Sequence, residues 1–156
     1  MFEDGAGVEI KTGVEFGKDI HLDTLRNDGY KAIFIANGAQ LSQKLRIPGE
    51  DLEGVFHAVE FLRYVALGKT VDVGEKIAVV GGGNSAIDAA RTSLRLGAKE
   101  ATILYRRSRN EMPALPHEIE AAEEEGIKFR FLVAPKQIIG EGGKVKAIEC
   151  LRMELV

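Results

Sequence analysis

In the second half of the chain, short apolar runs alternate with segments of helical spacing. The runs at 77–80, 100–105 and 127–133 have the length and composition of strands. Between them, segments 85–96 and 116–126 favour helices that each end at a glycine. The order strand, helix, strand, helix, strand predicts a parallel sheet joined by right-handed crossovers. We therefore expect an α/β domain of Rossmann-like topology with helices on both faces of the sheet.

After Pro135 the pattern changes to two extended runs separated by the turn "EGG". The runs "KQIIG" and "KVKAIECLRMELV" predict a C-terminal antiparallel β-hairpin. In the second run, five apolar side chains alternate onto one face. They are Val145, Ala147, Leu151, Met153 and Leu155.

The first half of the chain is less regular. Residues 7–16 contain two short β-like runs, and residues 22–29 predict a short helix that ends at a glycine. The continuous apolar run 32–36 predicts a strand covered on both faces, followed by the turn dipeptide Asn37-Gly38. Residues 57–67 have the apolar spacing of an amphipathic helix.

Composition narrows the possible functions. With 156 residues and 45% hydrophobic content, the chain suffices for one domain or two small lobes. A net charge of −3 gives no general attraction for nucleic acids or membranes, and no apolar run approaches the roughly 20 residues that span a bilayer. The single cysteine, Cys150, excludes a disulfide framework, and the three histidines lack metal-ligand spacing. We expect a cytoplasmic protein without nucleic-acid, membrane or metal sites.

A glycine-rich turn joins the strand at 77–80 to the helix that follows. Its sequence is Gly81-Gly82-Gly83-Asn84-Ser85-Ala86, which has the form G-x-G-x-x-A. In this context Gly81 permits the tight turn, Gly83 lets the backbone approach a pyrophosphate, and Ala86 lets the helix pack on the sheet. Asn84 and Ser85 are expected as helix cap and pyrophosphate neighbours. A structural turn without a ligand is the alternative, and the strand-helix context favours dinucleotide binding.

The end of the next strand bears on which dinucleotide binds. An NAD site usually has an acidic residue there, whereas this chain has Arg106 and Arg107, and no carboxylate lies between residues 100 and 111. Guanidinium groups match a 2′-phosphate, so the sequence favours NADP(H) over NAD(H). The alternative is a solvated basic loop that balances the acidic helix after it, with Arg109 as a bystander. Tyr105 could cover an adenine or be a packed strand end.

Several segments together resemble a known family. They are "AIFIANGAQ", "IPGEDLEGV", "VVGGGNSAIDAARTSLRLGA", "YRRSRNEMPA" and "EAAEEEGIKF". In this order they resemble the small (beta) subunit of glutamate synthase and related NADPH-dependent flavoproteins of the pyridine-nucleotide-disulphide-oxidoreductase type, from about Gly7 onward. The resemblance implies an FAD domain interrupted by an NADP(H) domain, of the three-layer FAD/NAD(P)-binding type. It also implies hydride transfer from NADPH to FAD and electron transfer to iron–sulphur clusters, often with a large catalytic or iron–sulphur partner subunit.

The resemblance also implies roles for individual residues. The glycine turn would hold the pyrophosphate, Arg106 and Arg107 the 2′-phosphate, and Met112 and Pro113 would shape the loop at the adenosine end. Residues 36–39 would lie where the two domains meet. They include Ala36, Asn37 and Gly38, where the family has Ala-Thr-Gly. No side chain is expected to act in catalysis, because the cofactors carry the chemistry.

The same resemblance suggests how the chain is divided. Residues 1–70 would be part of a flavin domain plus a connecting helix, and residues 71–156 the NADP(H) domain. The family's own FAD glycine fingerprint is missing, because "DGAGVE" has no strand before it, so we expect an internal fragment with an incomplete FAD site. Three alternatives stay open: a ferredoxin-dependent or pyrimidine-reducing relative, a non-catalytic NADP-sensing or subunit-interaction module, and assembly as a homo-oligomer.

Overall fold

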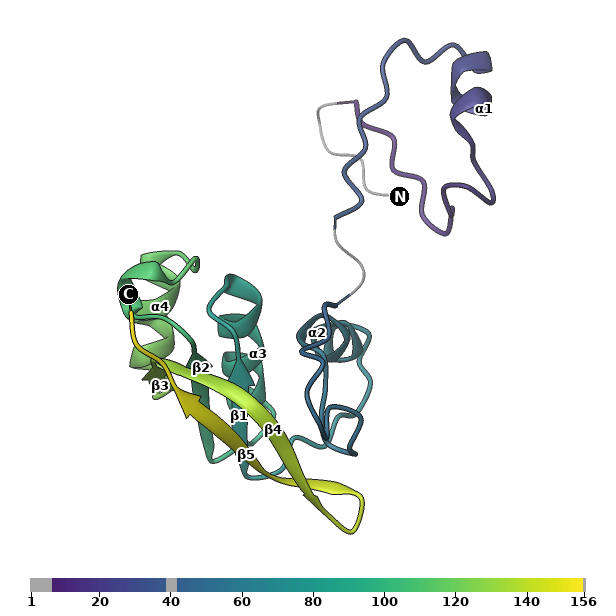
Figure 1. The fold of residues 1–156 in the computed structure, drawn as a ribbon. Helices are drawn as coiled ribbons and strands as arrows, with labels where there is room; N and C mark the ends of the chain where they lie inside the picture. Colours follow the sequence, from purple (N-terminus) through teal and green to yellow (C-terminus); the bar gives the residue numbers. More distant parts are fainter. Residues whose placement is uncertain (1–6, 39–41, 156) are drawn as a thin grey trace. The chain divides into compact units, whose positions relative to one another are not determined.

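The computed structural model describes residues 7–38 and 42–155 (Figure 1). The chain divides into two compact units, residues 1–38 and 39–156. Each unit is described by itself.

The first unit contains the predicted short helix, α1 (Leu22–Asn27). Gly29 follows it at a φ of 92°, a left-handed conformation that favours glycine and ends the helix. A tight loop precedes α1, in which the Gly17 N–H donates to the Ile20 carbonyl at 2.8 Å. Among residues 7–38, β pairing is limited to one isolated bridge between Phe16 and Ile20.

The strand predicted at 32–36 does not form, and neither do the β-like runs in 7–16. Phe34 is 92% exposed and Ile35 66% exposed, so the apolar run is not covered on either face. A strand needs a hydrogen-bonded neighbour and apolar layers against its side chains. The described residues of this unit provide neither for segment 32–36, which explains why the pattern alone was misleading.

The second unit is built on a three-stranded parallel sheet in the order β1-β2-β3 (Figure 1). Two crossover helices join the strands, as the sequence predicted. The elements are β1 (Lys76–Val80), α3 (Asn84–Arg95), β2 (Glu100–Tyr105), α4 (Pro116–Glu124) and β3 (Lys128–Phe131). The core lies between these helices and the sheet, where Ile87 of α3 and Ile103 of β2 are fully buried. Ala90 of α3 is also fully buried, and its small side chain lets the helix approach the strands closely.

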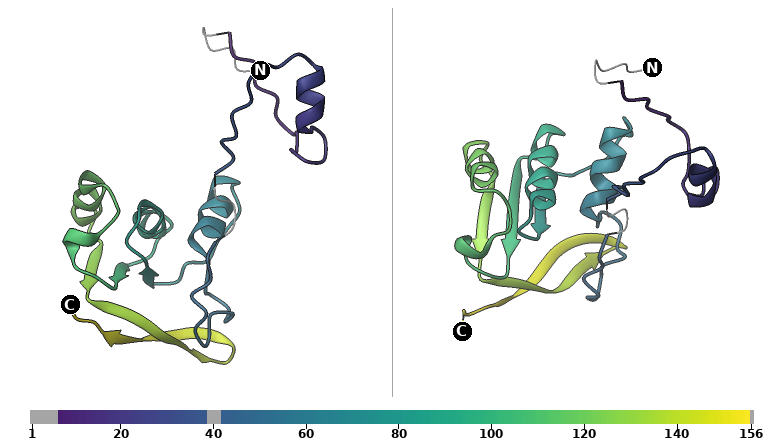
Figure 2. Two further views of the ribbon diagram at one scale, coloured as in Figure 1. Left: turned by 45° about the horizontal axis from the view of Figure 1, so that its top comes forward. Right: turned by 90° about the horizontal axis from the view of Figure 1, so that it is seen from above.

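The layers differ from the prediction in one respect. Figure 2 shows α3 and α4 on one side of the sheet and a hairpin, β4 (Val133–Glu141) and β5 (Lys144–Arg152), on the other. The fold class is confirmed, but the second face is covered in part by antiparallel strands where helices were expected. The sequence pattern could not reveal this, because the hairpin follows the sheet in the chain and only its docking places it there.

The predicted hairpin forms with two register shifts, between Pro135 and Gln137 and between Ile139 and Gly140. Leu151 is 51% exposed. The register shift pairs Ile139 with Ala147 but Gly140 with Val145, so Val145 faces away from Ala147 and Leu151. The alternation predicted one shared apolar face for them, and this prediction is wrong because it did not include the bulge. The neighbouring face is more covered, because Ile148 and Cys150 are half-buried. Burial raises the pKa of the Cys150 thiol, so the thiolate is disfavoured.

A single residue, Leu132, joins the parallel sheet to the hairpin. Its φ of 57° turns the chain between β3 and β4. Its N–H donates to the Arg107 carbonyl at 3.1 Å, and its carbonyl accepts from the Met153 N–H at 2.8 Å. Leu132 therefore connects three parts of the chain that lie far apart in sequence.

The 47–55 segment, part of the motif "IPGEDLEGV", lies against the hairpin. The Ile138 N–H donates to the Pro48 carbonyl at 2.8 Å, and Glu53 exchanges backbone hydrogen bonds with the hairpin turn. A Cβ on Gly49 would lie 2.1 Å from the Ile138 carbonyl oxygen, so only glycine fits there. This close approach fixes the segment to the β4–β5 hairpin.

The predicted helix at 57–67 forms as α2 (Ala58–Ala66) and ends near Gly68, whose φ is 69°. Its Phe61 is buried at 5% exposure. Both α2 and the 47–55 segment belong to the second compact unit, whose boundary falls between Gly38 and Ala39. The division of the chain at residue 70 into flavin and NADP(H) parts stays a prediction.

In the parts of the chain that the structure describes, no helix has both the length and the apolar character needed to cross a bilayer. The same residues contain no group of three or more His, Cys, Asp or Glu side chains placed to hold a metal ion.

Candidate functional site

The glycine turn, residues 81–86, leaves the carboxyl end of β1 and opens α3. Gly81 has a φ of 143°, and its N–H donates to the Leu104 carbonyl of β2 at 3.1 Å. A Cβ on Gly81 would come within 3.4 Å of the Ala86 Cβ. The φ of Gly81 favours glycine, and the small, buried side chain of Ala86 lies beside it, in agreement with the motif.

The second glycine is constrained by an aromatic ring. A Cβ on Gly82 would lie 2.5 Å from Cε2 of Tyr105, the last residue of β2. Tyr105 is only 9% exposed, and its hydroxyl donates to the Glu111 carbonyl at 2.6 Å. Of the two interpretations left open for Tyr105, the structure supports the packed strand end.

The start of α3 offers a set of unpaired backbone donors. The N–H groups of residues 82–85 donate no hydrogen bond to another residue that the structure describes. Gly83 is the N-cap at φ −91° and ψ 173°, and a Cβ on it would meet nothing within 4 Å. Free N–H groups at the positive end of the helix dipole form a ready site for an anion.

The expected capping role of Asn84 or Ser85 is wrong, because Gly83 occupies the N-cap position and no side chain caps the helix. Instead, Oδ1 of Asn84 accepts a hydrogen bond from the Leu115 N–H at 3.0 Å. The Ala114 N–H donates to the Gly82 carbonyl, also at 3.0 Å. The segment before α4 is thus tied to the glycine turn at two points.

The arginine loop, residues 106–111, follows β2. Arg106 and Arg107 are exposed and form no ion pair with another described residue. A short 3-10 turn, η1 (Arg109–Glu111), completes the loop. Arg106 and Arg107 follow the carboxyl end of β2, and the glycine turn follows the carboxyl end of the neighbouring strand, β1. Parallel sheets bind ligands at this edge.

The arginine loop is closed by a capping box. The Ser108 N–H donates to Oε2 of Glu111 at 2.9 Å, and Oγ of Ser108 accepts from the Asn110 N–H at 3.3 Å. Hydrogen bonding to Ser108 holds the pKa of the Glu111 carboxyl below its ordinary value. Glu111, the first carboxylate after β2, is therefore ionised and engaged within the loop.

Arg109 behaves differently from its two neighbours. Its Nη1 pairs with Oε1 of Glu123, and its Nη2 donates to Oε2 of the same carboxylate at 2.9 Å. This hydrogen-bonded pairing lowers the pKa of Glu123 and raises that of Arg109. The charge of Arg109 is balanced by Glu123 of α4, which is consistent with the bystander interpretation.

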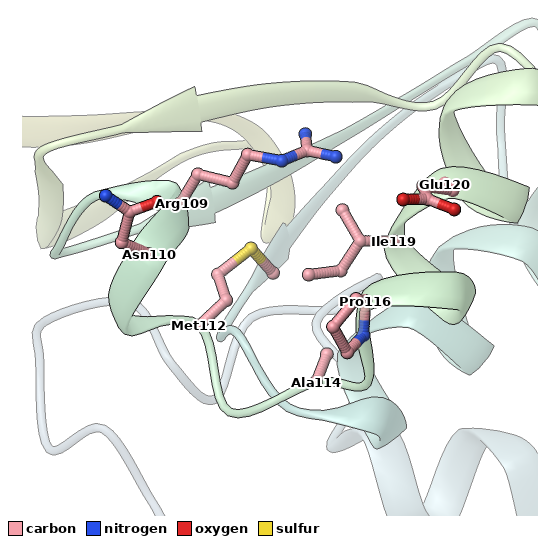
Figure 3. A pocket seen from close by; sticks show the side chains of 7 residues that line it. All are labelled: Arg109, Asn110, Met112, Ala114, Pro116, Ile119 and Glu120. Atoms are coloured by element: carbon pink, nitrogen blue, oxygen red, sulfur yellow. The ribbon is translucent and has the colours of Figure 1, made fainter.

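A pocket of about 300 Å³ lies between the arginine loop and the start of α4 (Figure 3). Figure 3 shows Met112 and Ile119 extending toward each other, with Asn110 turned away from them. Met112 lines this pocket, whereas the exposed Pro113 does not, and the predicted role of both residues at the adenosine end stays a prediction. The lining residues are Arg109, Asn110, Met112, Ala114, Pro116, Ile119 and Glu120.

The structure brings the glycine turn and the arginine loop together within the second unit. Ala36, Asn37 and Gly38, the predicted junction residues, belong to the first unit, and Ala39 lies outside the described residues. Their part in a cofactor site stays a prediction.

Sequence reasoning missed the ion-pair cluster that joins α3 to α4. Arg91 donates to Glu118 at 2.8 Å and to Glu125 at 2.6 Å, and Arg95 donates to Glu125 at 2.9 Å. Two arginines one helical turn apart, opposite an acidic helix, were the available signal. The contacts of Tyr105 with Gly82 and of Asn84 with Leu115 left no comparable signal.

Comparison with known proteins shows which family the chain matches. Residues 4–153 match the family described as pyridine nucleotide-disulphide oxidoreductase. The NADPH-Fe(3+) oxidoreductase subunit beta of Geobacter sulfurreducens is 44% identical in an alignment 156 positions long, which covers 96% of this chain and 23% of that protein. The glutamate synthase [NADPH] small chain of Escherichia coli is 37% identical over 163 residues, covering 97% of this chain and 34% of the relative.

A third relative is the NADP(+)-dependent formate dehydrogenase subunit beta of Moorella thermoacetica, which is 43% identical. The alignment covers 96% of this chain and 21% of that subunit. The chain thus spans between 21% and 34% of these three curated relatives.

Solved structures agree on the fold. A variant of FprA from Mycobacterium tuberculosis superposes with a TM-score of 0.72 at 24% identity, over 92% of this chain and 47% of that one. FprA in complex with NADPH gives 0.64 at 21% identity, over 91% and 52%. The resemblance seen in the motifs is confirmed, and the chain belongs to the pyridine nucleotide-disulphide oxidoreductase family.

Proposed function

We propose that this chain is the NADP(H)-binding part of a flavin-dependent oxidoreductase of the glutamate synthase small-chain type. One observation carries the proposal. The unpaired N–H groups of residues 82–85 and the exposed guanidinium groups of Arg106 and Arg107 follow neighbouring strands, β1 and β2, at the carboxyl edge of one sheet. That pairing suits a dinucleotide with a pyrophosphate and a second phosphate.

The residues present fit NADP(H) better than NAD(H). An NAD site needs a carboxylate at the end of β2 to accept a hydrogen bond from the ribose 2′-hydroxyl. Here the first carboxylate, Glu111, is engaged by Ser108 within the arginine loop. Arg106 and Arg107, in contrast, have no ion-pair partner among the described residues and are available to a 2′-phosphate.

In this proposal the residues of the chain bind and orient the dinucleotide, and none acts as acid or base. When bound, NADPH supplies a hydride to FAD, and this transfer needs no side-chain proton donor. The glycine turn holds the pyrophosphate, and the arginine loop holds the 2′-phosphate. Residues 36–38 would meet the flavin side, with residues 1–70 as the flavin-domain segment and 71–156 as the NADP(H) domain.

The path beyond the flavin is part of the same proposal. Two of the relatives are named as beta subunits, one of an NADPH-Fe(3+) oxidoreductase and one of an NADP(+)-dependent formate dehydrogenase. We infer by analogy that electrons pass to iron–sulphur clusters and that a partner subunit receives them. In a chain extended to the length of these relatives, reduction of bound flavin by NADPH tests this step, and NADPH binding without flavin reduction would favour the NADP-sensing alternative.

The binding experiment uses the 156-residue chain and isothermal titration with NADPH and NADH. We expect NADPH to bind at least tenfold more tightly, because only it offers a 2′-phosphate to Arg106 and Arg107. Arg106→Ala and Arg107→Ala should each weaken NADPH binding by about 1–3 kcal/mol and leave NADH binding unchanged. Arg63→Ala, an exposed arginine on α2, is the control with the same change of charge.

Equal affinity for NADPH and NADH in the unaltered chain would refute the proposed preference. So would a double Arg106→Ala, Arg107→Ala variant that still prefers NADPH.

A further inference from the structure

We infer that Asn84, Tyr105 and Glu111 are positioning residues that determine the preference for NADPH over NADH, because they hold the arginine loop in place against the glycine turn. The inference rests on the proposed function, since it assumes that Arg106 and Arg107 bind the 2′-phosphate. It assigns a role to three side chains whose contacts are internal to the protein.

Tyr105 contacts both the glycine turn and the arginine loop. Its ring occupies the space that a Cβ on Gly82 would need, so the ring sets how close the glycine turn can come to β2. Its hydroxyl donates to the Glu111 carbonyl at 2.6 Å, so the same side chain also fixes the far end of the arginine loop. At 9% exposure, Tyr105 acts on a ligand through these neighbours.

Glu111 closes the arginine loop. Its carboxylate accepts the Ser108 N–H at 2.9 Å, directly after Arg106 and Arg107, and completes the capping box of the loop. At the other end of the loop, the Leu132 N–H donates to the Arg107 carbonyl at 3.1 Å. The backbone that carries the two arginines is therefore held on both sides.

Asn84 completes the connection from the glycine turn. Its Oδ1 accepts the Leu115 N–H at 3.0 Å, and the Ala114 N–H donates to the Gly82 carbonyl at 3.0 Å. The segment that leaves Glu111 is therefore attached to the turn that would hold the pyrophosphate. These bonds hold the glycine turn and the arginine loop, the two proposed phosphate-binding elements, in place relative to each other.

The connection between the glycine turn and the arginine loop affects the affinities for NADPH and NADH differently. The pyrophosphate and the 2′-phosphate of NADPH are joined covalently at a limited range of separations. A shift of the arginine loop relative to the glycine turn therefore weakens NADPH binding. NADH has no 2′-phosphate and uses the glycine turn alone, so it is insensitive to that shift. The ratio of the dissociation constants, Kd(NADH)/Kd(NADPH), is thus the readout of positioning.

The test is Tyr105→Phe in the full chain, with Kd measured for both nucleotides. The phenylalanine ring still fills the space beneath Gly82, so the fold is kept and only the bond to Glu111 is removed. We expect Kd(NADH)/Kd(NADPH) to fall about three- to tenfold, with Kd(NADH) unchanged. Tyr64→Phe, which removes the phenol bond to Glu60 on α2, is the matched control and should leave the ratio unaltered.

Glu111→Ala and Asn84→Ala provide independent variants, because each removes the side-chain acceptor of one of these bonds, and each should lower the same ratio. Circular dichroism and urea unfolding confirm that each variant is folded. If the unaltered chain shows no preference for NADPH, the proposed function fails. If it prefers NADPH but Tyr105→Phe and Glu111→Ala keep the ratio within twofold, or weaken both nucleotides equally, the positioning inference alone is overturned.

Discussion

At the scale of single residues, two adjacent glycines are required for different reasons. Gly82 faces the Tyr105 ring, and a Cβ there would overlap it at 2.5 Å. Gly83 faces open space, and its backbone is in an extended conformation that any residue adopts. The first glycine is therefore required by the fold, whereas our proposal assigns the second to the approach of a ligand.

Alanine substitutions separate these two requirements. Gly82→Ala should lower the free energy of unfolding by about 1–3 kcal/mol, because the ring of Tyr105 must shift. Gly83→Ala should leave stability within about 0.5 kcal/mol of the original and weaken NADPH and NADH alike, because its methyl group stands where the pyrophosphate would approach. Urea unfolding and nucleotide titration of both variants check this, and an unstable Gly83→Ala with unaltered binding would contradict it.

The motif predicted only part of this site. The requirement for Gly81 and Ala86 follows from local backbone geometry, so the spacing G-x-G-x-x-A was sufficient to predict it. The contact of Tyr105 with Gly82 crosses from one strand to the next, and the bond from Leu115 to Asn84 joins residues 31 positions apart. Such contacts depend on how elements pack, which a one-dimensional pattern does not record.

At the scale of elements, the correctly predicted strands of the parallel sheet are those that hydrogen-bond to a neighbouring strand in the same unit. β1, β2 and β3 pair with one another across crossovers, so each apolar run finds its neighbour within the same unit. Segment 32–36 is a similar apolar run without a described partner, and it forms no strand and is exposed. An apolar run predicts the capacity to form a strand, whereas pairing decides whether it does.

The contact between α3 and α4 gives a prediction about stability. Arg91 is 21% exposed and binds two carboxylates on the opposite helix, whereas Arg95 is 62% exposed and shares one of them. Arg91→Ala should lower the free energy of unfolding by about 1–2 kcal/mol, and Arg95→Ala by less than about 0.5 kcal/mol. Urea titrations of the two variants test this, and equal losses would show that the extra burial of Arg91 contributes nothing.

The α3–α4 cluster and the Arg109–Glu123 pair together predict how stability depends on pH. Hydrogen bonds from Arg91 lower the pKa of the Glu125 carboxyl, and Arg109 lowers that of Glu123. A carboxyl whose pKa is lower in the folded state stabilises the fold above its unfolded pKa, near 4.3, and loses that effect as the pH falls through the folded value. We expect unfolding free energies to decrease below about pH 4.5, and Arg91→Ala to reduce this slope.

At the scale of the whole molecule, all the elements of the proposed nucleotide site lie in the second unit. The 47–55 segment and α2 also belong to that unit, although the sequence placed them before the boundary at residue 70. The structure therefore offers two possible starts for an autonomous nucleotide-binding domain, near residue 42 and near residue 71.

Truncated chains distinguish these two starts. A chain of residues 42–156 should keep its NADPH affinity within about twofold, because it retains the glycine turn, the arginine loop and the hairpin contacts. A chain of residues 71–156 loses Phe61 and the backbone bonds from Pro48 and Glu53 to the hairpin. It should be less stable by at least about 2 kcal/mol. If the shorter chain unfolds at the same urea concentration, the earlier boundary at residue 70 is the correct one.

Leu132 has a consequence for the order of folding events. Its backbone joins the arginine loop, the end of β3 and the residue after β5, three parts that are distant along the chain. Bonds that close long loops form late, after local helices and the first strand pairs. During refolding, helical circular dichroism should therefore recover before the capacity to bind NADPH. A newly made chain would acquire its ligand only once its last strand has docked.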